Sequence, residues 1–134
     1  KLLADHLARH KAADLFIDTI PYNGHATASD ALWSGLPVLT RIGKSFSSRV
    51  SASLLNVLDL SELITYTEKE YEDLAIELAK NPNKLKEIKN KLEKNKTNKP
   101  LFNTKLFATN IESAYVKIYD RYLQNLPVDN IEIE

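Results

Sequence analysis

Short apolar runs alternate with amphipathic segments along most of the chain, and this alternation predicts strands separated by helices. Three runs, at 15–17, 37–40 and 63–66, have the length and apolar content of buried strands. Apolar residues recur at helical spacing in the segments 2–12, 28–33, 50–57 and 71–78. Strands that alternate with helices indicate βαβ units, so we predict an α/β fold with a Rossmann-like parallel sheet.

Residues typical of helix ends flank these segments. Gly35 comes two residues after the second helical segment and is predicted to end that helix in a left-handed conformation. Ser47 or Ser48 is predicted to cap the third helix. Thr67 and Glu70 have the spacing of a capping box, which predicts that the fourth helix begins just after Thr67.

The last third of the chain is predicted to be helical. Helices are expected near 82–94 and 104–123, joined by a polar link at 95–102. The lysine-rich side of the first of these helices is predicted to face solvent. The apolar stripe of the second is predicted to be core, and its members are Phe107, Ile111, Tyr115, Ile118 and Tyr122. We expect one subdomain at 1–126 and a tail at 127–134. Because three strands are few and the first residue is not Met, we expect this subdomain to be incomplete at its N-terminus.

Composition narrows the classes of function. Among 134 residues, 18 basic side chains balance 18 acidic ones, so the net charge gives no general attraction to nucleic acid or to an anionic membrane. The chain has no cysteine, which excludes disulfides and thiol chemistry. No apolar run approaches the roughly 20 residues that a membrane span needs. The beginning of the chain has the pattern of an amphipathic helix rather than a signal peptide, so we expect a cytoplasmic protein.

The junction between the first strand and the second helix is the best candidate for chemistry. Ligands of parallel sheets bind beyond the carboxyl ends of the strands, and a helix that begins there offers unpaired amides to a phosphate. Gly24 would let the backbone approach a ligand closely, and Thr27 would supply a hydroxyl donor. Asp30 lies on the same helical face, where it could accept hydrogen bonds from ribose. The alternative is that these residues are ordinary helix caps of an α/β protein.

Two other patterns favour different sites only weakly. His6 and His10 are spaced as two metal ligands on a helix could be, but the acidic residue and third ligand of a zinc motif do not accompany them, so we predict no metal site. The residues Gly43-Lys44-Ser45 match the end of a Walker A loop, but Val38 stands where that loop requires glycine. Lys44 or Arg49 could still add positive charge to a diphosphate site.

Longer strings of residues carry a family resemblance. They are DTIPYNGHATASDALWSGLPV at 18–38, GKSFSSRVSASLL at 43–55, EY at 70–71 and PLFNT at 100–104. Together they resemble the C-terminal catalytic domain of the O-GlcNAc transferase and SPINDLY family, glycosyltransferase family 41, over nearly the whole chain. The resemblance implies a GT-B architecture, in which two Rossmann-like halves face each other across a donor cleft. The chain would be the latter part of the C-terminal half, which binds the nucleotide and ends in several helices.

The resemblance also implies an activity and its partners. Such an enzyme transfers a sugar, most simply N-acetylglucosamine from UDP-GlcNAc, to Ser or Thr of a protein or peptide acceptor, without a metal cofactor. The N-terminal catalytic half, and tetratricopeptide repeats that often precede it, would belong to the same polypeptide. Two alternatives stay open: the donor is GDP-fucose or UDP-glucose, or the segment is a catalytically inert nucleotide-binding or interaction module.

Site residues are carried over by position from the resemblance. His6 and Arg9 match residues near the donor's nucleoside, and His25 matches a histidine near the diphosphate and the sugar. Thr27 matches a threonine that donates to the phosphates, and Asp30 matches the acid on the ribose. With Gly24, these residues form the predicted donor site, and no catalytic residue is predicted within this segment.

Two positions depart from the family pattern. Ala26 stands where many relatives have a second threonine, which removes one hydroxyl donor from the predicted phosphate site. Since a hydrogen bond to a charged group contributes roughly 1.5–3 kcal/mol, we expect this loss to weaken donor binding. Leu3 stands at the place of a lysine found in some relatives.

Overall fold

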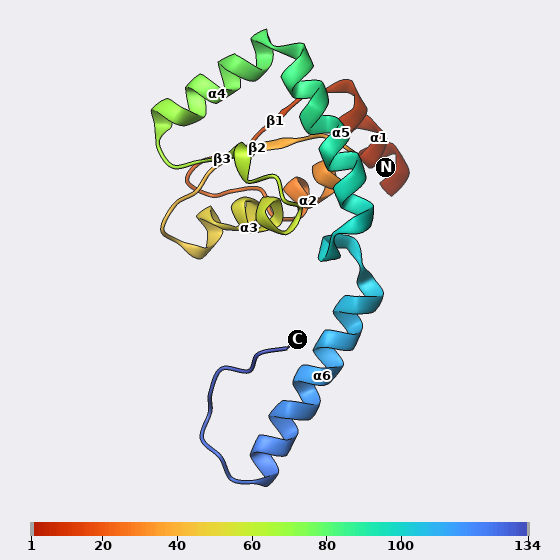
Figure 1. The fold of residues 1–134 in the computed structure, drawn as a ribbon, viewed down its shortest axis with the longest axis vertical. Coiled ribbons are helices and arrows are strands. Elements are labelled where there is room, and N and C mark those ends of the chain that lie inside the picture. Colours follow the sequence, from red (N-terminus) through yellow and green to blue (C-terminus); the bar gives the residue numbers. More distant parts are fainter. Residues whose placement is uncertain (1, 134) are drawn as a thin grey trace. The chain divides into compact units, whose positions relative to one another are not determined.

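The computed structural model describes residues 2–133 as two compact units, of which the first ends at Phe102 and the second begins at Asn103. The first unit holds the sheet, and the second holds a long helix (Figure 1). The predicted subdomain at 1–126 stays a prediction.

The sheet of the first unit is parallel and follows the order β1-β2-β3. Its strands are β1 (Phe16–Ile17), β2 (Val38–Arg41) and β3 (Ile64–Thr65). Phe16 lies opposite Val38, and Thr40 lies opposite Ile64. The predicted α/β class with a parallel sheet is confirmed. Strands β1 and β3 fall within the predicted runs, and β2 extends one residue beyond its run, to Arg41.

Helices cover both faces of this sheet. The helices of the first unit are α1 (Leu3–Arg9), α2 (Ala26–Trp33), α3 (Val50–Val57), α4 (Glu68–Lys80) and α5 (Pro82–Asn98). Figure 1 shows α2 and α3 on one side of the sheet and α4 on the other. The core between the layers consists mainly of leucine, including Leu32, Leu36, Leu55, Leu58, Leu60, Leu63, Leu78 and Leu92. Its burial fixes the strand ends relative to the helix that follows each of them.

Two of the three predicted helix ends are confirmed. Gly35 ends α2 with a φ of 85°, a left-handed conformation that favours glycine. Thr67 and Glu70 form the complete capping box of α4. The predicted cap at Ser47 or Ser48 is wrong, because both residues belong to a 3₁₀ turn at Phe46–Ser48 and α3 begins after Arg49 without a side-chain cap.

The second unit consists of α6 (Thr104–Leu123) and the segment that follows it. The predicted core stripe of α6 is not buried within the described residues: the side chains of Tyr115 and Tyr122 are 67% and 73% exposed. After the helix, Arg121 and Lys117 donate to the main-chain carbonyls of Pro127 and Glu132 at 2.6 and 2.7 Å. The segment therefore returns alongside the helix that precedes it.

Candidate functional site

The carboxylate of Asp18 organises the loop that follows β1. Asp18 is 3% exposed, and its Oδ1 accepts hydrogen bonds from the amides of Gly24 and Thr19 at 2.7 and 2.9 Å. Its Oδ2 accepts from Thr40 Oγ1 at 2.6 Å. None of these partners is a cation. The cost of burying the carboxylate is therefore offset by the three hydrogen bonds rather than by an opposite charge. Because Gly24 directly precedes the N-cap residue of α2, the carboxylate also determines where α2 begins.

Tyr71 of α4 holds the same loop from the other side of the sheet. Its hydroxyl donates to the main-chain carbonyl of Asp18 at 2.6 Å. Burial raises the pKa of Tyr71 to about 12; the negative charge of Asp18 adds to the rise and Arg41 opposes it. The phenol is therefore protonated and able to donate at neutral pH. Asp18, the first residue of the loop, is therefore held at two points. Thr40 of β2 bonds to its carboxylate, and Tyr71 of α4 bonds to its main-chain carbonyl.

The N-terminus of α2 emerges from this anchored loop. His25 is its N-cap residue, and among the described residues no side chain caps the helix. The first main-chain bond of the helix runs from the N–H of Ser29 to the carbonyl of His25 at 3.0 Å, so the amides of residues 26–28 precede the helical bonding pattern. Thr27 is exposed in this first turn. Unpaired amides, an exposed hydroxyl and the positive end of the helix dipole together suit an anionic ligand.

Gly24 has a packing role at this helix end. A Cβ placed on Gly24 would lie 2.9 Å from Thr27 Oγ1 and 3.2 Å from Ala28 N. Glycine therefore allows the first turn of α2 to lie directly against the loop. The expectation that Gly24 also allows close approach of a ligand stays a prediction.

Three side chains on α1 and α2 form a connected polar group. Arg9 Nη2 donates to His6 Nδ1 at 2.7 Å, and His6 Nε2 lies 3.1 Å from Asp30 Oδ2. Since arginine has only donors, Nδ1 is the acceptor and Nε2 carries the proton that it donates to Asp30. This arrangement fixes the ring of His6 and directs the carboxylate of Asp30 toward α1.

A second loop, between β2 and α3, holds the first one. The carbonyl of Ser47 accepts from the main-chain N–H of Asn23 at 2.9 Å and from Nε2 of His25 at 3.4 Å. Ser51 Oγ, on α3, donates to the carbonyl of Gly24 at 2.9 Å, and Ser51 is fully buried. The guanidinium of Arg49 donates to the carbonyl of Gly43 at 3.0 Å. The two loops thus form one structure at the carboxyl ends of β1 and β2.

Aromatic side chains border the N-terminus of α2. The ring of Tyr22 stacks on that of His25 with their centroids 4.9 Å apart, and Phe46 meets His25 edge-on at 6.0 Å. Tyr22 and Phe46 are exposed, so His25 is the half-buried centre of this group. Lys44 is exposed in the same second loop, and its contribution to an anion site stays a prediction.

The predicted site residues lie together around the first half of α2. Gly24, His25, Thr27 and Asp30 follow one another along the loop and the helix, and His6 and Arg9 join them through the contact with Asp30. The sequence predictions missed three residues that support this site, namely Thr40, Ser51 and Tyr71. They also gave no role to Asp18, although an acidic residue directly after an apolar strand and six residues before a glycine is a usable signal.

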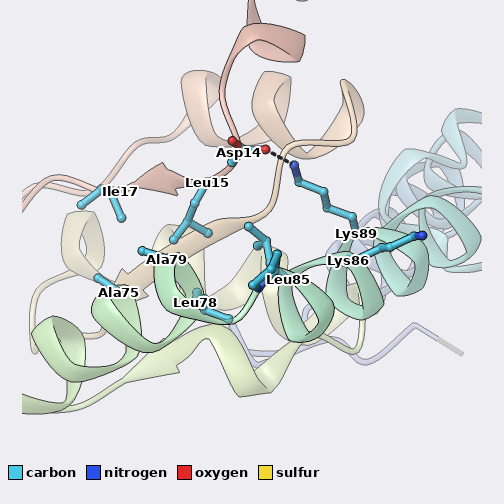
Figure 2. A pocket seen from close by; sticks show the side chains of 10 residues that line it. Asp14, Leu15, Ile17, Ala75, Leu78, Ala79, Leu85, Lys86 and Lys89 are labelled. Carbon is cyan, nitrogen blue, oxygen red and sulfur yellow. Dashed lines mark hydrogen bonds and ion pairs between the residues drawn. The ribbon is translucent and has the colours of Figure 1, made fainter.

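A hollow of about 560 Å³ lies elsewhere, beside the edge strand β1. Figure 2 shows that its lining comes from β1 and the two residues before it, from α4 and from α5, and is mainly apolar. The ion pair between Asp14 and Lys89 lies at its rim (2.7 Å). None of the predicted donor-site residues lines it. The hollow is therefore separate from the candidate site.

Neither a cluster of three metal-ligand side chains nor a membrane-spanning helix is present among the described residues. Between residues 2 and 133, no three His, Cys, Asp or Glu side chains are grouped as metal ligands. Over the same range, no helix has both the length and the apolar character needed to cross a bilayer.

Comparison with known proteins identifies the family. The sequence profile of glycosyl transferase family 41 matches residues 3–111. The chain belongs to glycosyl transferase family 41. It therefore shares its ancestry with the O-GlcNAc transferases, and the six predicted site residues lie within the matched segment.

Individual relatives agree with this assignment. The UDP-N-acetylglucosamine--peptide N-acetylglucosaminyltransferase of Caenorhabditis elegans is 33% identical over 127 residues, which cover 95% of this chain and 11% of that protein. The probable enzyme SPINDLY of Hordeum vulgare is 33% identical over 118 residues, covering 88% of this chain and 12% of that protein. A mutant of the O-GlcNAc transferase of Thermobaculum terrenum superposes with a TM-score of 0.86 at 30% identity, covering 93% of this chain and 24% of that one. The chain thus spans a small part of its relatives' length.

The buried carboxylate of Asp18, directly after β1, is predicted to stabilise the fold more than the exposed carboxylate of Asp14, before β1. Asp18→Ala removes the acceptor of three donors and should lower the free energy of unfolding by about 3 kcal/mol, and Thr40→Val, which removes one donor, by about 1–2 kcal/mol. Urea denaturation followed by circular dichroism measures both. Asp14→Ala, at an exposed ion pair before β1, is the control and should have little effect. Equal destabilisation by Asp14→Ala and Asp18→Ala would contradict this role.

The raised pKa of Tyr71 predicts a pH dependence of stability. The phenol has a pKa of about 12 in the folded chain and about 10 when unfolded, so its contribution is complete below pH 10 and is lost as the pH rises toward 12. Urea denaturation of the wild type and of Tyr71→Phe between pH 8 and 12 should give stabilities that converge at the upper end. Tyr66→Phe, at an exposed tyrosine, is the matched control. A constant difference between wild type and Tyr71→Phe over this range would rule out the linkage.

Proposed function

We propose that this chain is the donor-binding part of a protein glycosyltransferase, and that the N-terminus of α2 binds the diphosphate of a nucleotide sugar, UDP-N-acetylglucosamine. The observation that carries the proposal is the anchored loop at 18–24, which presents the first amides of α2 and the exposed hydroxyl of Thr27 at the carboxyl edge of the sheet. The relatives' names, which specify UDP-N-acetylglucosamine and a peptide acceptor, supply the substrate classes.

The chemistry of transfer explains why a helix N-terminus is suitable. When the bond between the sugar and the diphosphate breaks, negative charge develops on the leaving phosphate oxygen. Amides and a hydroxyl that are already oriented stabilise this charge without reorganisation. His25, which is held between Tyr22 and the carbonyl of Ser47, would contact the donor near the sugar.

The polar group formed by His6, Arg9 and Asp30 would complete the nucleotide site. Asp30 has one Oδ2 contact to His6 and is about one-third exposed, so its carboxylate can still accept from ribose hydroxyls. His6 and Arg9 extend the site from the ribose toward the base. Binding would therefore run along α2 from the diphosphate to the nucleoside.

The remaining parts of the enzyme would come from outside this segment. The chain spans 11% and 12% of the two relatives above, so we propose that it forms part of the C-terminal half of a GT-B enzyme and works with an opposing N-terminal half. That half would contribute the catalytic groups and the acceptor site. The isolated chain would then bind nucleotide without turnover, and product formation by the chain alone would contradict this view.

Removal of the Thr27 hydroxyl tests the diphosphate site. Thr27→Val, which keeps the shape of the side chain, should weaken UDP binding about tenfold or more, because one hydrogen bond to a charged phosphate is lost. Thr27→Ser keeps the hydroxyl and should retain most of the affinity, and Ala26→Thr should strengthen binding. Isothermal titration with UDP and with uridine separates the phosphate contribution from that of the nucleoside. Unchanged UDP affinity in Thr27→Val would remove Thr27 from the site.

The choice of base is tested by comparing UDP with GDP. The proposal expects UDP to bind more tightly to the wild type. Arg9→Ala should reduce the preference, because it removes the support of His6 on the nucleoside side. Titration of both nucleotides against both proteins measures the two ratios. Tighter binding of GDP would assign the chain to a different donor.

A further inference from the structure

Ser51 links α3 to the main chain of the loop at 18–25, which is here called the donor loop because it is proposed to bind the nucleotide-sugar donor. It lies in the first turn of α3, has no exposed surface, and donates its hydroxyl proton to the carbonyl of Gly24 at 2.9 Å. Gly24 is itself buried, and its amide is held by Asp18 Oδ1 at 2.7 Å. Both main-chain polar groups of Gly24 are therefore fixed, the N–H by Asp18 directly after β1 and the carbonyl by Ser51 of α3.

The geometry of the peptide bond passes this constraint on to His25. The carbonyl of Gly24 and the N–H of His25 belong to the same planar trans peptide, so they point in opposite directions. Because Ser51 draws the carbonyl toward α3, the N–H of His25 points away from α3. Within residues 2–133 this N–H has no hydrogen-bond partner. It lies next to the amides of residues 26–28 at the N-terminus of α2.

We infer that Ser51 is a positioning residue for the donor diphosphate: by holding the carbonyl of Gly24, it directs the N–H of His25, together with the first turn of α2, at the phosphates. The inference rests on the function proposed above. Ser51 does not touch the ligand and acts through the Gly24–His25 peptide. Its hydroxyl suits the role because it is short, buried and already part of a helix, so little freedom remains to be lost when the ligand binds.

The second loop gives the same peptide a further support. The carbonyl of Ser47 accepts from Nε2 of His25 and from the amide of Asn23, the residues on either side of Gly24. With Ser51, these bonds hold three successive residues of the donor loop on α3 and on the turn before it. A rotation of the Gly24–His25 peptide would therefore break the Ser51 bond and would turn the N–H of His25 away from the proposed ligand.

The test compares UDP with uridine, because only UDP carries the phosphates that the peptide would address. In Ser51→Ala, we expect UDP affinity to fall about five- to tenfold and uridine affinity to stay unchanged, as measured by isothermal titration. Ser51→Cys keeps a weak donor of similar size and should give an intermediate UDP affinity. Asn95→Ala is the matched control, because it removes another buried donor to a main-chain carbonyl (Leu58, 2.7 Å) far along the sequence from the loop, and should change neither affinity.

The outcomes separate this inference from the proposed function. If UDP and uridine weaken by the same factor in Ser51→Ala, or if neither weakens, Ser51 has no positioning role and the proposed function stands. If the wild type binds UDP no more tightly than uridine, the diphosphate site itself is refuted and the role of Ser51 falls with it. A UDP-induced shift of the His25 amide resonance in the wild type that is reduced in Ser51→Ala and in Ser51→Cys supports the inference, and an unreduced shift overturns it.

Discussion

The hydrogen bonding of the Asp18 carboxylate is the constraint on which the rest of the first unit depends. A buried carboxylate is tolerated only when donors replace the water that it loses, and here the donors are two loop amides and the hydroxyl of Thr40. A loop path that moved the amides of Thr19 and Gly24 away would leave Oδ1 of this carboxylate without these partners. The carboxylate therefore selects one loop conformation, and that conformation fixes the position and the direction of α2. The site at the start of α2 follows from one acidic residue placed at the end of a strand.

This arrangement would provide the proposed anion site in a chain with no excess of positive charge. The 18 basic and 18 acidic residues cancel, so attraction to a diphosphate has to be local. Peptide amides at a helix start supply it, because their partial charges add to the positive end of the dipole and fall off within a turn. Such a site depends on orientation more than on charge. For this reason the buried side chains that orient the loop, such as Asp18 and Ser51, would matter as much for the proposed binding as those that would face the ligand.

The sequence predicts the elements well, because apolar periodicity records which residues enter the core. The three strands, the glycine end of α2 and the capping box of α4 all arise from local patterns and were predictable. The predicted cap at Ser47 or Ser48 is wrong, because serine also favours tight turns. Both serines belong to the 3₁₀ turn at Phe46–Ser48, where the Ser48 hydroxyl donates to the carbonyl of Ser45. Contacts across the fold leave no local pattern. Tyr71 is 53 residues from Asp18 and Ser51 is 27 residues from Gly24, so only the packed sheet reveals that they meet.

The position of Asp30 beside the proposed diphosphate site is electrostatically unfavourable, because a carboxylate and a phosphate repel each other. The contacts of Asp30 reduce this conflict. His6 donates to its Oδ2, and the Arg9 guanidinium bonds to the far side of the same imidazole, so a positive charge lies behind the carboxylate before any ligand binds. The direction of the chain adds to this effect, because Asp30 lies three residues beyond Thr27, nearly one turn further from the helix start. The phosphates would then meet amides and a hydroxyl, and the ribose would meet the carboxylate. Under the proposed function, one short helix would bind both parts of a nucleotide because its acidic residue lies about one turn beyond its first residues.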